Sequence, residues 1–129
     1  PGRPMAGGIL SGRPVMCLPG NPVAAFVCYR LAAAPVLDRM AGGIARPLLR
    51  PRVKCGFDHR KSAGRAEYLR VKVTTDATGE PEMHLHGRKG AGVLSSLTGA
   101  DGLVEIPVEN TGVAVGDYLP FIPFRESGL

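Results

Sequence analysis

A turn that joins an extended apolar run to a helical pattern constrains the fold of the first part of this 129-residue chain. The apolar run Pro14–Cys17 is followed by Leu-Pro-Gly-Asn-Pro-Val over Leu18–Val23. Proline and glycine end an extended segment and form a tight turn. Asn21 has the side chain of a helix N-cap, and Pro22 suits the first helical position because an N–H there would have no intrahelical partner. The pattern therefore predicts a strand that turns directly into a helix.

The predicted helix is amphipathic and contains a proline. Apolar residues recur every three or four positions over Val23–Met40. Pro35 lies within this run and should kink or break the helix, because it has no N–H and its ring meets the preceding turn. Two glycines at 42–43 mark the helix C-terminus. The apolar runs Met5–Leu10 and Pro14–Leu18, separated by Ser-Gly-Arg, predict a hairpin ahead of the helix.

One hairpin and one helix are too few layers to bury a core. We therefore expect residues 1–46 to pack against further layers that sequence before Pro1 would supply. The chain opens on Pro1 without a Met, which fits a C-terminal fragment of a longer protein.

Short apolar runs with period-two character replace the helical pattern after residue 51. Turns rich in Gly, Asn and Asp separate them. The candidate strands are Arg50–Cys55, Glu67–Thr74, Glu82–Gly87, Gly102–Pro107 and Tyr118–Phe124. This arrangement predicts a small antiparallel β-barrel or sandwich over residues 47–129 and an α+β chain overall.

Composition narrows the functional classes. Mean hydropathy is +0.05, and no apolar run approaches the roughly 20 residues of a membrane-spanning helix. Cys17, Cys28 and Cys55 are odd in number and form no Cys-x-x-Cys pair, so they favour a reducing cytoplasm over a disulfide framework or zinc site. The net charge of +5 favours phosphates, oxyanions or nucleic acid as partners. Aromatic residues make up only 5% of the chain and Trp is absent, which leaves few platforms for base stacking.

Several motifs resemble the MoeA family of molybdopterin molybdenumtransferases, which is similar to the E domain of gephyrin. Leu-Pro-Gly-Asn-Pro-Val is the most specific of them. Arg-Ala-Glu-Tyr-Leu-Arg resembles the family's strand Arg-x-Glu-(Tyr/Phe)-x-Arg, and Ala-Asp-Gly-Leu resembles its Ala-Asn-Gly-Leu strand. The matching segments follow the family's order: Pro1–Pro4, Gly12–Val15, Leu18–Val23, Arg65–Arg70, Ser95–Leu97 and Ala100–Leu103.

The resemblance implies a fold, an activity and partners. Residues 1–46 would be the C-terminal piece of an α/β domain with a molybdopterin-binding-like fold, and residues 47–129 the family's β-barrel domain IV. The intact enzyme would insert molybdenum from molybdate into adenylylated molybdopterin and release AMP, in molybdenum cofactor biosynthesis. It would be a cytoplasmic homodimer with sites between subunits, and this chain alone would be inactive. The acidic ligands of the enzyme's Mg²⁺ would lie outside this chain.

The resemblance also implies binding residues, with no catalytic acid or base among them. Arg3 lies between prolines in Pro-Gly-Arg-Pro, where the family usually has Lys, and its guanidinium could hold a tetrahedral oxyanion such as molybdate. Pro4 fixes the backbone beside it. Asn21 and the N–H groups after it could contact the anion at the helix N-terminus. Many relatives have Ser at the position of Ala24, which has no hydroxyl to offer.

Two further binding residues are implied in the barrel region. Arg65 would contact the oxyanion or the pterin phosphate across a subunit interface. Strand alternation places Arg65 and Glu67 on one face and Arg70 on the other. Ser96 would donate its hydroxyl to the oxyanion, with Ser95 as the alternative register.

Simpler interpretations stay open for these residues. Arg3 and Arg65 could be solvated surface charges, and the serines ordinary loop residues. His59, His84 and His86 invite a metal site, but the pattern favours exposed strand histidines because no Cys or carboxylate completes the ligand set. The alternative function is a small basic β-barrel that binds nucleic acid or a protein partner.

Overall fold

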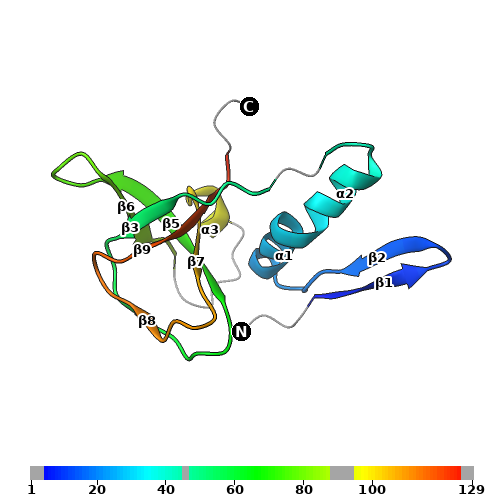
Figure 1. Cartoon of the computed structure of the whole chain (residues 1–129), viewed down its shortest axis with the longest axis horizontal. Coiled ribbons are helices and arrows are strands. Elements are labelled where there is room, and N and C mark those ends of the chain that lie inside the picture. The colour runs from blue at the N-terminus through cyan, green and yellow to red at the C-terminus, as the bar shows by residue number, and fades with distance from the viewer. Residues whose placement is uncertain (1–4, 45–46, 88–94, 126–129) are drawn as a thin grey trace. The chain divides into compact units, whose positions relative to one another are not determined.

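The structure of the chain is a computed structural model that describes residues 5–44, 47–87 and 95–125. These residues form two compact units, one up to Leu48 and the other from Leu49 onward. Figure 1 shows a hairpin with a helix in the first unit and a closed set of strands in the second. None of the described helices has the length and apolar character needed to cross a membrane.

The first unit begins with the predicted hairpin. Strand β1 (Ala6–Leu10) pairs antiparallel with β2 (Arg13–Cys17). The two residues between them, Ser11 and Gly12, have φ of 49° and 74°. Positive φ at both positions is what a two-residue turn needs to match the twist of the flanking strands.

The predicted helix forms, and its irregularity is a π-helical turn. It consists of α1 (Pro22–Cys28), the π-helical turn η1 (Tyr29–Ala33) and α2 (Ala34–Met40). Pro35 lies in the first turn of α2, immediately after η1. Because proline donates no N–H, the ladder is interrupted at this point, and a π-helical turn with bonds five residues back absorbs the change. The helix therefore continues past Pro35.

The glycine pair ends the helix in a Schellman motif. Gly42 has a φ of +83°. Its N–H donates to the Arg39 carbonyl oxygen at 3.1 Å, and the Gly43 N–H donates to the Asp38 carbonyl oxygen at 2.9 Å. These bonds satisfy carbonyls that the last helical turn leaves free, and the left-handed residue costs glycine no steric strain.

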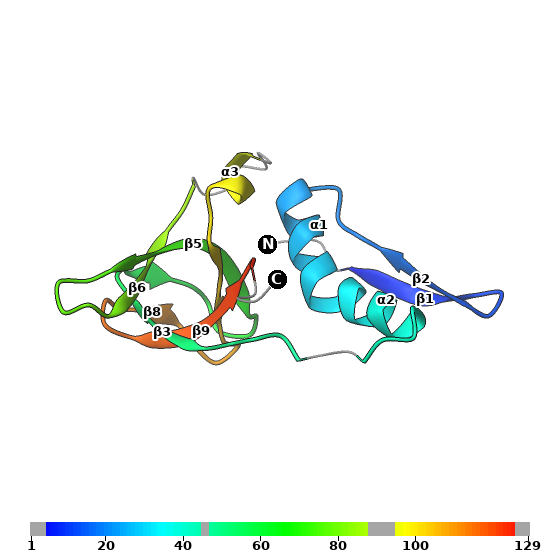
Figure 2. The ribbon, with the colours of Figure 1, turned by 90° about the horizontal axis from the view of Figure 1, so that it is seen from above.

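The second unit is a closed five-stranded barrel in the order β3-β6-β5-β7-β9 (Figure 2). Each predicted strand is present, with ends within two residues of the prediction. The strands are β3 (Arg52–Cys55), β5 (Glu67–Thr75), β6 (Pro81–Leu85), β7 (Gly102–Ile106) and β9 (Tyr118–Pro123).

The sequence predicted an antiparallel barrel, and the structure departs from that prediction at one pair of strands. Strands β3 and β6 pair in parallel, with Lys54 opposite Glu82 and Cys55 opposite Met83. The other four neighbouring pairs are antiparallel. Directions cannot alternate around a closed ring with an odd number of strands, so one parallel pair is required. The β3–β6 pair is that closing contact.

The interior of the barrel follows the period of two expected for strands with one buried face. On β5, for example, Leu69, Val71 and Val73 all belong to the core, and the residues between them do not. The fully buried members are Cys55, Val71, Met83, Val104 and Ile106, with Phe57, Val113 and Leu119 packed among them. The barrel therefore has a core of its own.

Three short elements were not predicted. Strand β4 (His59–Arg60) pairs antiparallel with β8 (Gly112–Val113), and α3 (Ser95–Thr98) precedes β7. A Cβ on Gly112 would lie 2.9 Å from the His59 carbonyl oxygen, so the two backbones approach too closely for a side chain. Segments of two to four residues are too short for a periodicity that a sequence pattern could reveal.

Candidate functional site

Arg65 lies in the connection between β4 and β5, in a bend before β5 begins at Glu67. It directly follows Gly64, whose φ is +101°. The prediction that Arg65 and Glu67 share one face of a strand is therefore wrong, because the chain turns at Gly64 and the period of two starts only after the bend. Arg70 does lie on β5.

The side chain of Arg65 is exposed. No hydrogen bond or ion pair joins its guanidinium to another residue of the described part of the chain. The carboxylate nearest in sequence, Glu67, is engaged elsewhere: its Oε2 lies 2.8 Å from Nε2 of His59. The guanidinium donors of Arg65 therefore remain available for a two-point contact with an oxyanion.

Asn21 caps α1 as predicted, but the cap occupies the donors that an anion would use. Its Oδ1 accepts from the N–H groups of Val23 at 3.0 Å and Ala24 at 3.3 Å. Its carbonyl oxygen accepts from the Ala25 N–H at 2.8 Å, and Pro22 has no N–H. An anion at this helix end would have to compete with the Asn21 side chain.

Ser96 precedes β7 and Arg65 precedes β5, so the two residues lie near opposite ends of the β5–β7 pair. Ser96 belongs to α3, ahead of the first residue of β7. Arg65 precedes Glu67, which pairs with Ile106, the last residue of β7. Because β5 and β7 are antiparallel, their starting points lie at opposite ends of the pair. Strand register alone therefore does not bring the two residues together.

The remaining predicted binding residues are divided between the units. Asn21 belongs to the first unit, whereas Arg65 and Ser96 belong to the second. Arg3 and Pro4 lie outside the described residues, and their proposed roles stay predictions.

A network of charged and polar groups fixes the turn between β5 and β6. Asp76 accepts from the Thr78 hydroxyl at 2.7 Å, the Lys54 ammonium at 3.0 Å, and the N–H groups of Thr78 and Glu80 at 2.8 and 3.0 Å. The bonds from Thr78 and Lys54 hold the pKa of the Asp76 carboxyl well below its usual range. The same contact raises the pKa of Lys54, which lies 3.6 Å from Glu82 as well. Because these charged groups are paired with one another, the network stabilises the turn and leaves no free charge to bind a ligand.

The histidines do not form a metal centre in the described part of the chain. Nε2 of His84 lies 3.0 Å from Oε1 of Glu82, and His59 contacts Glu67. Strand β6 ends at Leu85, so His86 follows it and does not share a strand face with His84. No three His, Cys, Asp or Glu side chains among the described residues gather where they could hold a metal ion.

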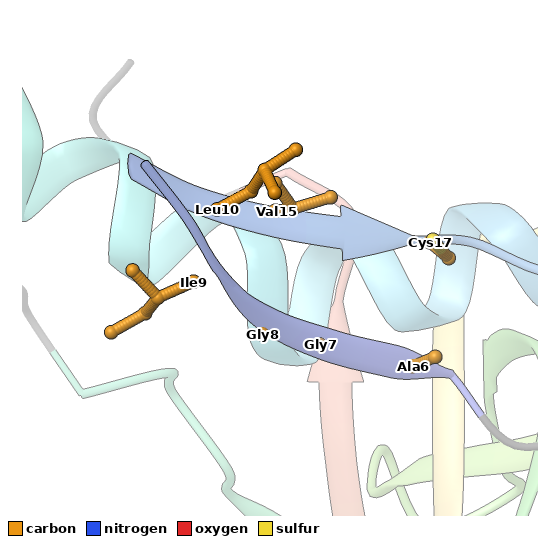
Figure 3. A pocket seen from close by; sticks show the side chains of 7 residues that line it. All are labelled: Ala6, Gly7, Gly8, Ile9, Leu10, Val15 and Cys17. Carbon is orange, nitrogen blue, oxygen red and sulfur yellow. The ribbon is translucent and has the colours of Figure 1, made fainter. Parts of the chain in front are cut away.

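An apolar hollow on the hairpin lacks the groups needed to recognise an anion. Figure 3 shows Ile9 on one side of the ribbon and Leu10 and Val15 on the other. The lining consists of Ala6, Gly7, Gly8, Ile9, Leu10, Val15 and Cys17, with no charged side chain. The side chains of this surface therefore offer no charge that could hold an oxyanion.

Comparison with known proteins identifies the barrel. Residues 52–124, from the start of β3 to the residue after β9, match the MoeA C-terminal region (domain IV). The chain belongs to the MoeA family. This confirms the resemblance drawn from the sequence motifs, and nothing in these similarities favours a nucleic-acid-binding barrel.

Individual relatives of this MoeA chain agree with the match. "Molybdopterin molybdenumtransferase 2" of Mycobacterium tuberculosis is 32% identical over 126 residues, covering 92% of the chain and 29% of that protein. The "Molybdenum cofactor synthesis protein cinnamon" of Drosophila melanogaster is 33% identical over 119 residues, covering 86% of the chain and 18% of that protein. The crystal structure of the molybdopterin biosynthesis MoeA protein from Pyrococcus horikosii matches with a TM-score of 0.72 and 27% identity, over 98% of the chain and 30% of that structure. The chain thus spans less than a third of each of these relatives.

Proposed function

We propose that this MoeA chain is the C-terminal part of a molybdopterin molybdenumtransferase. The intact enzyme takes adenylylated molybdopterin and molybdate, inserts molybdenum into the dithiolene and releases AMP. The observation that carries the proposal is the domain IV match over residues 52–124, together with an unpaired, exposed arginine in the family's Arg-x-Glu motif. The chain alone, without the remaining domains, is expected to be inactive.

Charge explains what Arg65 contributes to this reaction. Molybdate is a dianion and must approach a substrate that already carries phosphate, so the two repel each other. A guanidinium can offset that repulsion and fix the orientation of a tetrahedral oxyanion through two parallel N–H donors. Since arginine stays protonated, it binds and orients the anion and takes no part in proton transfer.

The other predicted residues complete the anion site in this proposal. Arg3, held by Pro4, supplies a second guanidinium, and Ser96 supplies a hydroxyl donor. Asn21 fixes the backbone that enters α1, since its side chain already accepts two N–H groups there. We propose that these groups meet in a homodimer, because the register of a single barrel separates the starts of β5 and β7.

The exposed apolar surface of the first unit supports its assignment to a larger α/β domain. Every residue of β1 is exposed, including Ile9 at 80% and Leu10 at 69%. Among the described residues of the helix, only Ala33 is buried. A soluble protein rarely leaves neighbouring apolar side chains this open, so we propose that the molybdopterin-binding-like domain of the intact enzyme covers them.

The described residues do not offer a site for the Mg²⁺ that the family implies, because no suitable set of three ligands gathers among them. We therefore assign no step on this chain to the metal ion. Its ligands are proposed to lie in the other domains of the enzyme, which we expect to work in the reducing cytoplasm, consistent with three free cysteines.

The experiment measures molybdenum insertion by the complete polypeptide that carries this chain, with purified adenylylated molybdopterin and varied molybdate. Arg65→Ala should lower kcat/KM for molybdate about 10- to 100-fold, since losing a charge-assisted contact is worth about 1.5–3 kcal/mol. Arg60→Ala is the matched control, because Arg60 is also an exposed arginine, five residues earlier. It should change kcat/KM less than about twofold if general surface charge matters little.

Two outcomes would refute the assignment. Equal losses in Arg60→Ala and Arg65→Ala would mean that overall positive charge, and not a specific contact, attracts the anion. Full activity of Arg65→Ala would remove Arg65 from the site. Tight binding of single-stranded RNA or DNA that falls steeply with salt and ignores molybdate would instead support the nucleic-acid alternative.

A further inference from the structure

The turn that carries Arg65 begins with an unusual residue. Lys61 is 9% exposed, and it is the only charged residue that is buried in the described part of the chain. The four residues after it, at 62–65, are all exposed. Lysine is rarely buried without an ionic partner. Its position just ahead of Arg65 therefore needs a physical explanation.

The Lys61 ammonium is bonded to backbone carbonyls. Its Nζ donates to the carbonyl oxygen of Ser62 at 3.0 Å and to that of Asn110 at 2.5 Å. No carboxylate of a described residue lies within salt-bridge distance of it. The contacts join the start of the turn to a segment 49 positions away in the sequence. Lys61 thus holds two loops together.

Backbone bonds fasten the same turn to the same segment. The Lys61 N–H donates to the Thr111 carbonyl oxygen at 3.2 Å. Two residues past Ser62, the Gly64 N–H donates to the Val108 carbonyl oxygen at 3.0 Å. The residue after Gly64 is Arg65 itself. The turn is therefore tied to residues 108–111 at both ends, with the free guanidinium immediately beyond the second tie.

Stability alone does not explain this arrangement. Moving an ammonium out of water costs several kcal/mol unless its partners compensate, and neutral carbonyls compensate less well than a carboxylate. An apolar side chain of similar length would avoid that cost. What the ammonium adds is geometric, because its donors hold two carbonyls from separate loops at fixed positions.

We propose that Lys61 is a positioning residue for anion binding. By tying the turn to residues 108–111, it restricts the backbone conformations of Ser62–Arg65 before any ligand arrives. The guanidinium then loses less conformational freedom on binding, which raises its affinity for an oxyanion. This inference rests on the proposed role of Arg65 and extends it to a residue that never contacts the anion.

Lys61→Met removes the donors and keeps an apolar side chain of similar length. Binding of sodium molybdate to the complete polypeptide is measured by calorimetry for wild type, Lys61→Met, Arg65→Ala and the double variant. Loss of pre-organisation should weaken molybdate binding about 3- to 10-fold in Lys61→Met, as expected for the ordering of one or two side chains or turns. In the Arg65→Ala background, Lys61→Met should not weaken molybdate binding further, because the turn then carries no guanidinium to position.

A second measurement reports on the turn itself. Amide hydrogen exchange at Gly64, whose N–H donates to the Val108 carbonyl oxygen, should become faster in Lys61→Met in the 129-residue chain, while exchange in β5 and β7 stays unchanged. Lys61→Gln, which retains N–H donors on a shorter side chain, should show a smaller change in the same direction. It also provides the comparison if the Met variant does not fold.

The outcomes separate this inference from the proposed function. If Arg65→Ala binds molybdate normally, the role of Arg65 is wrong, whatever Lys61 does. If Arg65→Ala weakens molybdate binding but Lys61→Met binds like wild type, the positioning role is wrong. It is also wrong if Lys61→Met weakens the residual binding of Arg65→Ala by the same factor as it weakens wild-type binding. Unchanged exchange at Gly64 in both Lys61 variants would also overturn it.

Discussion

Replacing Gly102 tests how closely the backbones of β7 and β9 must approach for these strands to pair in the closed barrel. Gly102 is the glycine of the Ala-Asp-Gly-Leu motif and the first residue of β7. A Cβ there would lie 2.4 Å from the Ile122 carbonyl oxygen and 2.5 Å from a ring carbon of Phe121. An ordinary contact begins at 3.4 Å, so the overlap with the backbone oxygen is 1 Å. The aromatic ring can rotate away, but the carbonyl can move only with β9.

The expected loss follows from this geometry. Overpacking costs about 1–3 kcal/mol, and an overlap with backbone belongs at the upper end, so Gly102→Ala should lose about 3 kcal/mol. For a domain of this size, that lowers Tm by about 12–24 °C. The assay is urea and thermal unfolding followed by circular dichroism in the β-sheet region.

Two other glycines provide graded controls for the same assay. A Cβ on Gly112 would meet a backbone oxygen at 2.9 Å, and Gly112→Ala should lose about 1 kcal/mol. A Cβ on Gly8 would meet nothing within 4 Å, and Gly8→Ala should leave the barrel transition unchanged. If Gly102→Ala unfolds within about 0.5 kcal/mol of wild type, or if the order of the three variants differs, the steric reasoning is refuted.

Two further predictions concern titratable groups. The depressed pKa of Asp76 contributes stability that is present above the unfolded pKa of about 4 and is lost as the pH falls toward the folded pKa. Between pH 7 and pH 3, the urea midpoint of unfolding should therefore decrease more for wild type than for Asp76→Asn. Equal decreases in the two proteins would contradict this role of Asp76. Burial, followed by the charge of Asp117, raises the pKa of the Cys55 thiol to about 11. Iodoacetamide at pH 8 should therefore label the exposed Cys17 in the native protein and reach Cys55 only in urea. Labelling of both at similar rates under native conditions, read by mass spectrometry, would show that the barrel does not protect Cys55.

Much of the fold could be predicted because its signals are local. Alternation of Leu69, Val71 and Val73 on β5 reflects the side-chain geometry of any strand. The cap at Asn21 depends only on residues up to four positions away. The glycine at 42 is required by its own φ. Each of these features follows from the chemistry of a few neighbouring residues.

The candidate site was harder to predict. The motif predicted a binding role for Arg65, but its position in a bend depends on the turn at Gly64, which interrupts the strand pattern. Lys61 carried no signal, because a single lysine near a turn is normally exposed. Its partners at 110 and 111 lie on the far side of β5 and β7 in the sequence. No local pattern could link them.

The amino-acid sequence by itself determined the family, the five barrel strands, the hairpin and the capped helix, because backbone conformations and burial patterns are set within a few residues. Only the tertiary structure decided which strands close the ring, where β7 must approach β9, and which buried cation fastens the Arg65 turn. Those features arise from contacts between residues that are distant in the sequence. Their geometry exists only after the strands have paired.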